Sequence, residues 1–101
     1  MWIFLTGAFL SIVDKDSDGT TLLVRARRAG DIERVFPGAE VIEGAGSDYR
    51  YRARIDREEV AQRMAEQVRG IRYANFKATV KDSRRGEAYL DVWDVMRQAQ
   101  E

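Results

Sequence analysis

Five arginines in two short segments are the side chains with the clearest capacity for binding chemistry. Arg25 and Arg27 stand two residues apart, and Arg50, Arg52 and Arg54 repeat that spacing further along the chain. Successive side chains of a β-strand point to opposite faces, so each set should lie on one side of its strand. If the two strands are neighbours, five guanidinium groups share one sheet surface. Guanidinium groups bind carboxylates and phosphates through paired hydrogen bonds, so we predict a partner-binding surface for an acidic protein patch or for nucleic acid.

The residues around these arginines favour one kind of partner. Tyr49 and Tyr51 alternate with the arginines, which predicts that the tyrosines point into the core and form no platform for base stacking. An RNA reader of the RRM type needs exposed strand aromatics, so a protein partner is favoured over nucleic acid. The alternative without a partner is a solvated sheet face on which Glu40 or Glu43 pairs with the arginines.

The segment from Asp14 to Gly19 matches the first half of a calcium-binding EF-hand loop, Asp-x-Asp-x-Asp-Gly. That loop requires a glutamate at its twelfth position, which supplies two ligand oxygens. The twelfth position counted from Asp14 is Arg25, a cation where an anion is needed. The flanking segments have the composition of strands. We therefore predict a polar hairpin turn and no metal site, with at most adventitious calcium binding.

Catalytic chemistry is poorly represented in this chain. Its 101 residues include no Cys and no His, which removes thiol and imidazole nucleophiles, bases and metal ligands. The 17 acidic residues form no recognisable catalytic pair, and no glycine-rich loop of the P-loop or Rossmann type is present. The sequence therefore predicts a protein that is not an enzyme and needs no cofactor.

Charge and hydropathy exclude further classes of function. Seventeen basic residues balance 17 acidic ones, so no overall field attracts the protein to nucleic acid or to anionic lipid. The apolar segment 1–13 is shorter than the roughly 20 residues of a membrane-spanning helix, and it lacks the basic start and cleavage site of a signal peptide. We expect a cytoplasmic protein without membrane association, consistent with the absence of Cys.

The pattern of apolar and turn residues predicts a single α+β domain over residues 1–101. It should contain a four-stranded, mostly antiparallel sheet with helices packed on one face, in the order ββαββαα. Gly7 can interrupt the first strand, and the side chain of Asp56 should cap the second helix. The expected elements are strands at 1–13, 20–27, 39–43 and 48–55, helices at 30–36 and 56–69, a turn at 44–47, and a last helix that begins at Asp82 or Ser83.

The first strand is apolar on both sides, whereas a sheet face that meets water is normally polar. Its two sides are Ile3, Leu5, Leu10 and Ile12, and Trp2, Phe4, Phe9 and Val13. We favour a central strand that the chain itself covers on both faces, the last helix being one cover. The alternative is that one side meets a partner. A homodimer formed through the first strand is one outcome of the second case.

Several segments also match a family pattern. They are MWIF at 1–4, FxSIV at 9–13, DYRYRA at 48–53, YxNFK at 73–77 and VWxVM at 92–96. Together they resemble a family of small, free-standing bacterial proteins of uncharacterised activity. The resemblance covers nearly the whole chain and implies a domain that is complete by itself. It implies no activity, cofactor or functional residue.

These observations favour a non-catalytic protein–protein interaction module, because a small domain without catalytic or cofactor motifs acts by occupying a surface of another molecule. Phage-style inhibitors, including anti-CRISPR proteins, are one class of such proteins. The alternative is a nucleic-acid-binding domain that uses the arginine-rich face.

Overall fold

The computed structural model describes residues 1–44 and 48–101. It divides into two compact units, Met1–Ile71 and Arg72–Glu101, and each unit is described by itself. The turn expected at 44–47 lies mostly outside the described residues. That residues 1–101 behave as a single domain stays a prediction.

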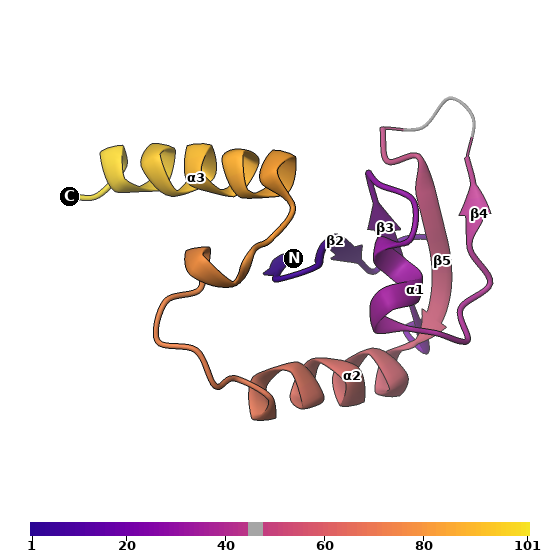
Figure 1. The fold of residues 1–101 in the computed structure, drawn as a ribbon. Coiled ribbons are helices and arrows are strands. Elements are labelled where there is room, and N and C mark those ends of the chain that lie inside the picture. The colour runs from indigo at the N-terminus through magenta and orange to yellow at the C-terminus, as the bar shows by residue number, and fades with distance from the viewer. Residues whose placement is uncertain (45–47) are drawn as a thin grey trace. The chain divides into compact units, whose positions relative to one another are not determined.

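The first unit is an antiparallel sheet with two helices, and the second contains a short 3-10 helix and a long α-helix (Figure 1). The expected α+β class is confirmed, but the described sheet has five strands where four were expected. The elements are β1 (Trp2–Leu5), β2 (Ala8–Val13), β3 (Thr21–Ala26), α1 (Asp31–Val35), β4 (Ile42–Glu43), β5 (Tyr51–Asp56), α2 (Arg57–Arg69), η1 (Lys77–Thr79) and α3 (Ser83–Gln98).

The fifth strand arises because the apolar segment 1–13 folds back on itself at Gly7. β1 and β2 form an antiparallel hairpin, and the amino group and carbonyl of Met1 both hydrogen-bond to the backbone of Ile12 at 2.8 Å. A Cβ atom at Gly7 would lie 2.9 Å from the Cδ atom of Arg34, so the turn passes close to a side chain that follows it in sequence. The expected order ββαββαα is therefore wrong at its start, because the structure has three strands before the first helix.

The strands lie in the order β1-β2-β3-β5-β4, and each neighbouring pair is antiparallel. Both expected hairpins are confirmed, because β2 pairs with β3 and β4 pairs with β5. β3 and β5 join the two hairpins through six paired positions, from Thr21 opposite Asp56 to Ala26 opposite Tyr51. The two segments that carry the arginines are therefore adjacent strands in the sheet.

One face of this sheet, called the inner face below, builds the hydrophobic core with α1 and α2. The burial of its apolar surface is the main stabilising contribution, at about 25 cal/mol for each Å² removed from water. Phe36, at the end of α1, is fully buried. The buried core cluster consists of Ala8, Leu10, Ile12, Val24, Ala26, Ile32, Val35, Phe36, Ala53, Ile55 and Val60.

The helices of the first unit are fixed by contacts at their ends. Gly30 precedes α1 with a φ of 91°, a left-handed conformation that favours glycine. The Asp31 carboxylate accepts a hydrogen bond of 3.0 Å from the backbone N–H of Phe9, which ties α1 to β2. Asp56 precedes α2 as expected, but its side chain makes no capping hydrogen bond, so the predicted cap is wrong. Gly70 ends α2, as predicted.

The second unit is held by a small aromatic cluster. The ring of Phe76 stacks on Tyr89 of α3 at a centroid distance of 5.8 Å and also contacts Tyr73 at 5.8 Å. The carboxylate of Asp82 accepts a hydrogen bond of 2.9 Å from the N–H of Arg85, which confirms one of the two predicted caps for α3. Helical spacing puts Trp93 on the same side of α3 as Tyr89, but Trp93 is 49% exposed.

Candidate functional site: the outer sheet face

The sheet face opposite the core carries the arginines on β3 and β5, as predicted. Arg25 pairs with Arg52 across the two strands, and Leu23 pairs with Arg54. Paired residues share a face, so Arg25, Arg52 and Arg54 lie on one surface, which we call the outer face. Arg27 and Arg50 lie just beyond the ends of β3 and β5, outside the paired positions.

The two arginines beyond the strand ends are neutralised by carboxylates. Arg27 pairs with Asp48 at 3.2 Å, and Arg50 pairs with Glu43 at 2.7 Å. The hydrogen bond that Arg27 donates to the Asp48 carboxylate raises the pKa of Arg27, and the one that Arg50 donates to Glu43 raises the pKa of Arg50. The pairing of Glu43 was an alternative considered from the sequence, whereas that of Asp48 was not foreseen. Both pairs are largely exposed, so they hold side-chain positions more than they stabilise the fold.

Arg54 is held by a different kind of partner. Its Nη1 atom donates a hydrogen bond of 2.8 Å to the backbone carbonyl of Lys15, in the turn between β2 and β3. The salt bridges found among the described residues include none for Arg54. Its exposed guanidinium group is fixed beside that turn by the contact with Lys15.

Arg25 and Arg52 differ from the other three. Each is half-buried, and among the described residues no carboxylate lies within ion-pair distance of either. The Nη2 atom of Arg25 donates to the hydroxyl of Ser11 at 2.8 Å. The Nε atoms of both arginines are buried and have no hydrogen-bond partner. A buried donor without a partner costs about 1–3 kcal/mol, and like charges on facing residues destabilise a sheet further.

Tyr49 is buried, as predicted, but it lies against Arg25 and Arg27 and not on the face opposite the arginines. The guanidinium carbons of Arg25 and Arg27 lie 4.6 and 4.1 Å from the centre of its ring, and Tyr49 is only 4% exposed. The prediction extended the alternation of β5 back to Tyr49, but that strand begins at Tyr51. Tyr51 does pack against the core as predicted. Tyr49 therefore holds two guanidinium groups in place by cation–π contacts.

Exposed apolar residues flank the arginine pair on the same face. The register places five residues in one row across the sheet: Trp2, Ser11, Arg25, Arg52 and Ile42. Trp2 is 67% exposed and Ile42 is 62% exposed, so both ends of the row are open. The expectation that the first strand is central and covered on both sides is wrong for β1, which lies at the edge of the sheet and leaves Trp2 exposed. The sequence did show that this strand has a second apolar side. It did not show that this side continues into the arginines.

An aromatic cluster extends this apolar region along β1 and β2. The rings of Phe4 and Phe9 lie 4.7 Å apart, and Trp2 contacts Phe9 edge-on at 6.2 Å. By the register, all three side chains lie on the outer face, Trp2 opposite Ser11 and Phe4 opposite Phe9. The outer face thus has an aromatic half on β1 and β2 and an arginine half on β3 and β5.

The segment that resembles an EF-hand forms the turn between β2 and β3. The carboxylate of Asp14 pairs with Arg57 at 2.7 Å. The carboxylate of Asp18 accepts hydrogen bonds from the hydroxyl of Thr20 at 2.6 Å and from its N–H at 3.0 Å, which lower the pKa of Asp18. No group of three or more acidic residues suited to a metal ion occurs in the described part of the chain. Asp18 therefore stabilises the turn, and Asp14 connects it to the first residue of α2.

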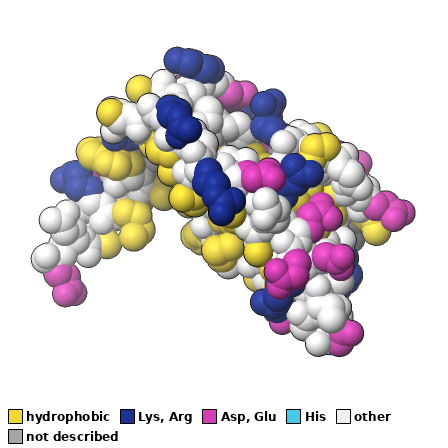
Figure 2. Space-filling view, turned by 90° about the horizontal axis from the view of Figure 1, so that it is seen from below, with side chains coloured by type: hydrophobic (Ala, Val, Ile, Leu, Met, Phe, Trp, Pro, Cys, Tyr) yellow, Lys and Arg dark blue, Asp and Glu magenta, His cyan; other side chains and the backbone are white. Residues whose placement is uncertain are grey.

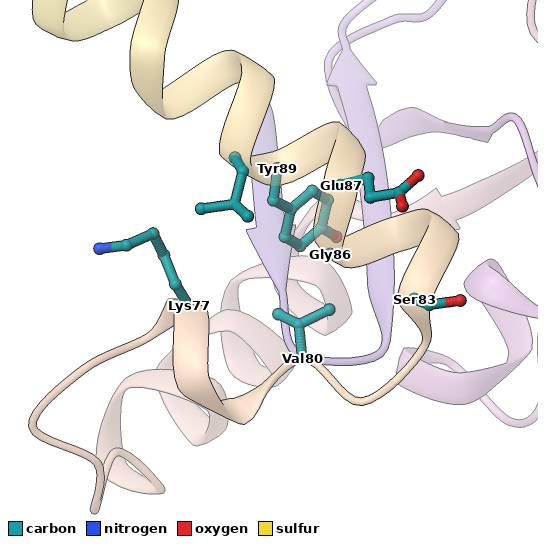
Figure 3. Close-up of a pocket in the computed structure, with 7 residues that line it drawn as sticks. Lys77, Val80, Ser83, Gly86, Glu87 and Tyr89 are labelled. Carbon is teal, nitrogen blue, oxygen red and sulfur yellow. The ribbon is translucent and has the colours of Figure 1, made fainter.

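The second unit contains a small pocket of about 270 Å³. Figure 3 shows Tyr89 and Val80 close together at its centre, while the ammonium group of Lys77 and the carboxylate of Glu87 point outward. Its remaining lining residues are Ser83, Gly86 and Leu90. The charged groups of Lys77 and Glu87 point away, so the lining of the pocket offers mainly apolar contact.

The charges elsewhere on the molecule are mixed in sign. On the face that Figure 2 shows, Lys and Arg side chains are interspersed with Asp and Glu, and apolar side chains lie between them. This mixture agrees with a formal net charge of zero. Across residues 1–44 and 48–101, no helix has the length and apolarity that crossing a membrane requires.

Comparison of the chain with protein-family models, with curated proteins and with solved structures gave no match.

Proposed function

We propose that this protein is a cytoplasmic, non-catalytic module that binds another protein through the outer face of its sheet. One observation carries the proposal: Arg25 and Arg52, which have no carboxylate partner in the described part of the chain, lie in a single row between two exposed apolar side chains, Trp2 and Ile42. Aromatic residues and Arg are enriched at protein interfaces, and Trp and Arg dominate their binding energy.

The partner should present an acidic group beside apolar surface. Apolar contact with Trp2 and Ile42 removes water from the row, and the positive charge of Arg25 and Arg52 selects a negative group between them. The paired carboxylates of Glu43 and Asp48 lie at the margin, where they keep the surrounding surface close to neutral. This arrangement suits a localised negative charge better than an extended polyanion.

The proposal is tested by affinity capture from lysate of the native host, with mass spectrometry of the recovered proteins. Each lysate is divided into nuclease-treated and untreated halves. The bait proteins are the unchanged chain, a Trp2→Ala/Ile42→Ala double variant, and a Val68→Ala control that removes an equally exposed apolar side chain from α2. We expect a protein that survives nuclease, is retained by the control, and is lost with the double variant. Equal recovery by all three baits contradicts the proposal.

Nucleic acid is a second candidate partner, and one observation favours it. Trp2, Phe4 and Phe9 lie on the same face as the arginines, which is the combination that single-strand binders use for base stacking and phosphate contact. Phosphate binding weakens steeply and log-linearly with salt, whereas an interface with an apolar centre is less sensitive. Recovery that nuclease abolishes, together with loss of single-stranded DNA binding in Arg52→Glu/Arg54→Glu, would decide for nucleic acid.

Self-association through the first strand is a third use of this region and stays a prediction. β1 lies at the edge of the sheet, contains no charged residue or Pro, and presents Trp2 to solvent. Natural edge strands usually carry charged residues or Pro, which prevent pairing with a second sheet. Sedimentation velocity over a range of concentrations tests the homodimer. A dimer that Trp2→Lys abolishes supports it, and a chain that stays monomeric at high concentration excludes it.

A further inference from the structure

We infer that Arg25 and Arg52 together bind one carboxylate group, supplied by an Asp or Glu side chain of the partner protein. The inference rests on the proposed function, which it deepens by naming the group that is recognised. It concerns a different part of the row from Trp2 and Ile42, so the two can be tested separately.

Two facing positive charges define this site. Arg25 and Arg52 face each other in register, and the Nε atoms of both are buried without a hydrogen-bond partner. Facing residues on antiparallel strands have Cβ atoms about 4.5–5.5 Å apart, so both guanidinium groups can reach one ligand. A guanidinium group presents N–H donors in a fixed fork that matches the two oxygens of a carboxylate. Such a ligand would offset the repulsion of the two charges.

One of the two guanidinium groups is also held in position before a ligand arrives. The Arg25 Nη2 atom bonds to the hydroxyl of Ser11 at 2.8 Å, and the Tyr49 ring lies 4.6 Å from its guanidinium carbon. Ser11 is 1% exposed and Tyr49 is 4% exposed, so neither contact is made by a freely moving side chain. A donor that is positioned beforehand loses less conformational entropy when it binds.

The surrounding arginines limit the site to a single negative charge. Arg27 and Arg50 already have carboxylate partners in Asp48 and Glu43. Arg54 donates to the carbonyl of Lys15. The phosphate backbone of a nucleic acid that lay across the face would be repelled by the carboxylates of Asp48 and Glu43. A single carboxylate between Arg25 and Arg52 would avoid that repulsion. The exposed apolar side chains of Trp2 and Ile42 complete a surface suited to an acidic residue with apolar neighbours.

The test follows the side-chain Nε–Hε resonances of arginine by NMR on the full chain. The probes are the capped tripeptide Gly-Glu-Gly, its matched control Gly-Gln-Gly, inorganic phosphate and a short oligothymidylate. We expect saturable shifts at Arg25 and Arg52 with the glutamate peptide, at least about fivefold larger than with the glutamine peptide. Arg27 and Arg50 should shift little because they are already paired.

Two variants keep this experiment decisive. Arg52→Gln should weaken binding of the glutamate peptide by at least about tenfold, because a buried ionic contact is lost. If Arg52→Gln does not fold, Arg52→Lys retains the charge without the fork and should still weaken binding by several fold. Arg63→Gln on α2 is the control and should leave binding unchanged, because Arg63 pairs with Glu66 on another surface.

Three results would overturn the inference: no shift with the glutamate peptide, equal shifts at Arg25, Arg27, Arg50 and Arg52, or binding that survives both Arg52 variants. Phosphate or oligothymidylate binding about tenfold tighter than the glutamate peptide would reassign the site to phosphate. Failure of the proposed function is a separate result. In that case the glutamate peptide binds as expected, but no captured protein depends on Trp2 and Ile42.

Discussion

Arg25 and Arg52 face each other across β3 and β5, and no carboxylate of residues 1–44 or 48–101 lies within ion-pair distance of either. Two positive side chains at facing positions repel, and each has a buried Nε atom without a partner. A sheet stabilised for folding alone would place an opposite charge or an apolar residue at one of these positions. The pair therefore lowers stability at the position where we place partner recognition, a compromise that is common at functional sites.

Arg52→Glu should make the first unit more stable while removing partner binding. The substitution replaces a repulsive facing pair with an attractive one and removes a buried donor, so we expect the free energy of unfolding to rise by about 0.5–1 kcal/mol. Urea denaturation followed by circular dichroism measures this change, and the capture experiment measures the loss of binding. If the outer face had no role in binding, Arg52→Glu would change the free energy of unfolding without removing any captured protein.

Arg54→Glu is the matched control for that prediction. Arg54 faces Leu23 instead of a second arginine, and its guanidinium donates to the carbonyl of Lys15. The same reversal of charge at Arg54 removes a hydrogen bond and relieves no facing repulsion. It should therefore leave the free energy of unfolding unchanged or lower it by about 0.5–1 kcal/mol. A gain in stability equal to that of Arg52→Glu would show that facing repulsion is not the cause.

The alternation of Arg52 and Arg54 was enough to predict the outer face, because β5 must bury Ala53 and Ile55 on its other side. The turn at Gly7 was harder, since the apolar run 1–13 has no cluster of polar turn residues to mark two strands. Tyr49 was misplaced because it precedes the first residue of β5. Alternation gives the face of a residue inside a strand but says nothing of a residue beyond its end.

Interactions between distant segments were the least predictable from sequence. The ion pair of Arg27 with Asp48 depends on β3 and β5 being neighbours and on where β5 begins. The exposure of Trp93 depends on how much of α3 the Phe76 cluster covers. Helical spacing predicts which residues share a face of a helix, but the partner of that face is set by tertiary structure.

Gly30→Ala should destabilise the first unit through the backbone alone. Gly30 has a φ of 91°, and no heavy atom outside its immediate surroundings lies within 4 Å of an added Cβ. A side chain in this conformation costs about 1–2 kcal/mol because of the strain between Cβ and the following carbonyl. Urea denaturation should show that loss. Gly38→Ala is the control, since it also has open space and no positive φ, and it should change stability by less than about 0.5 kcal/mol.

Asp18 should make the turn between β2 and β3 sensitive to acid. Hydrogen bonds from the hydroxyl and N–H of Thr20 stabilise its carboxylate and lower its pKa below the ordinary value of 3.8. In the unfolded chain Asp18 takes up its proton near that ordinary value, and in the folded chain only at a lower pH. The stability it contributes is therefore complete above about 3.8 and is lost as the pH falls through the folded pKa.

Carbon-detected NMR titration of the Asp18 carboxyl group measures this pKa directly. Thr20→Val removes the hydroxyl donor at 2.6 Å, which is the largest cause of the shift, so the pKa of Asp18 should move back toward its ordinary value. Asp18→Asn should remove this contribution to the acid dependence of unfolding, because the amide does not titrate. If the pKa of Asp18 in the unchanged chain lies at or above 3.8, the hydrogen bonds to Thr20 do not hold the turn in solution. A low pKa that persists in Thr20→Val would instead assign the shift to the backbone N–H of Thr20.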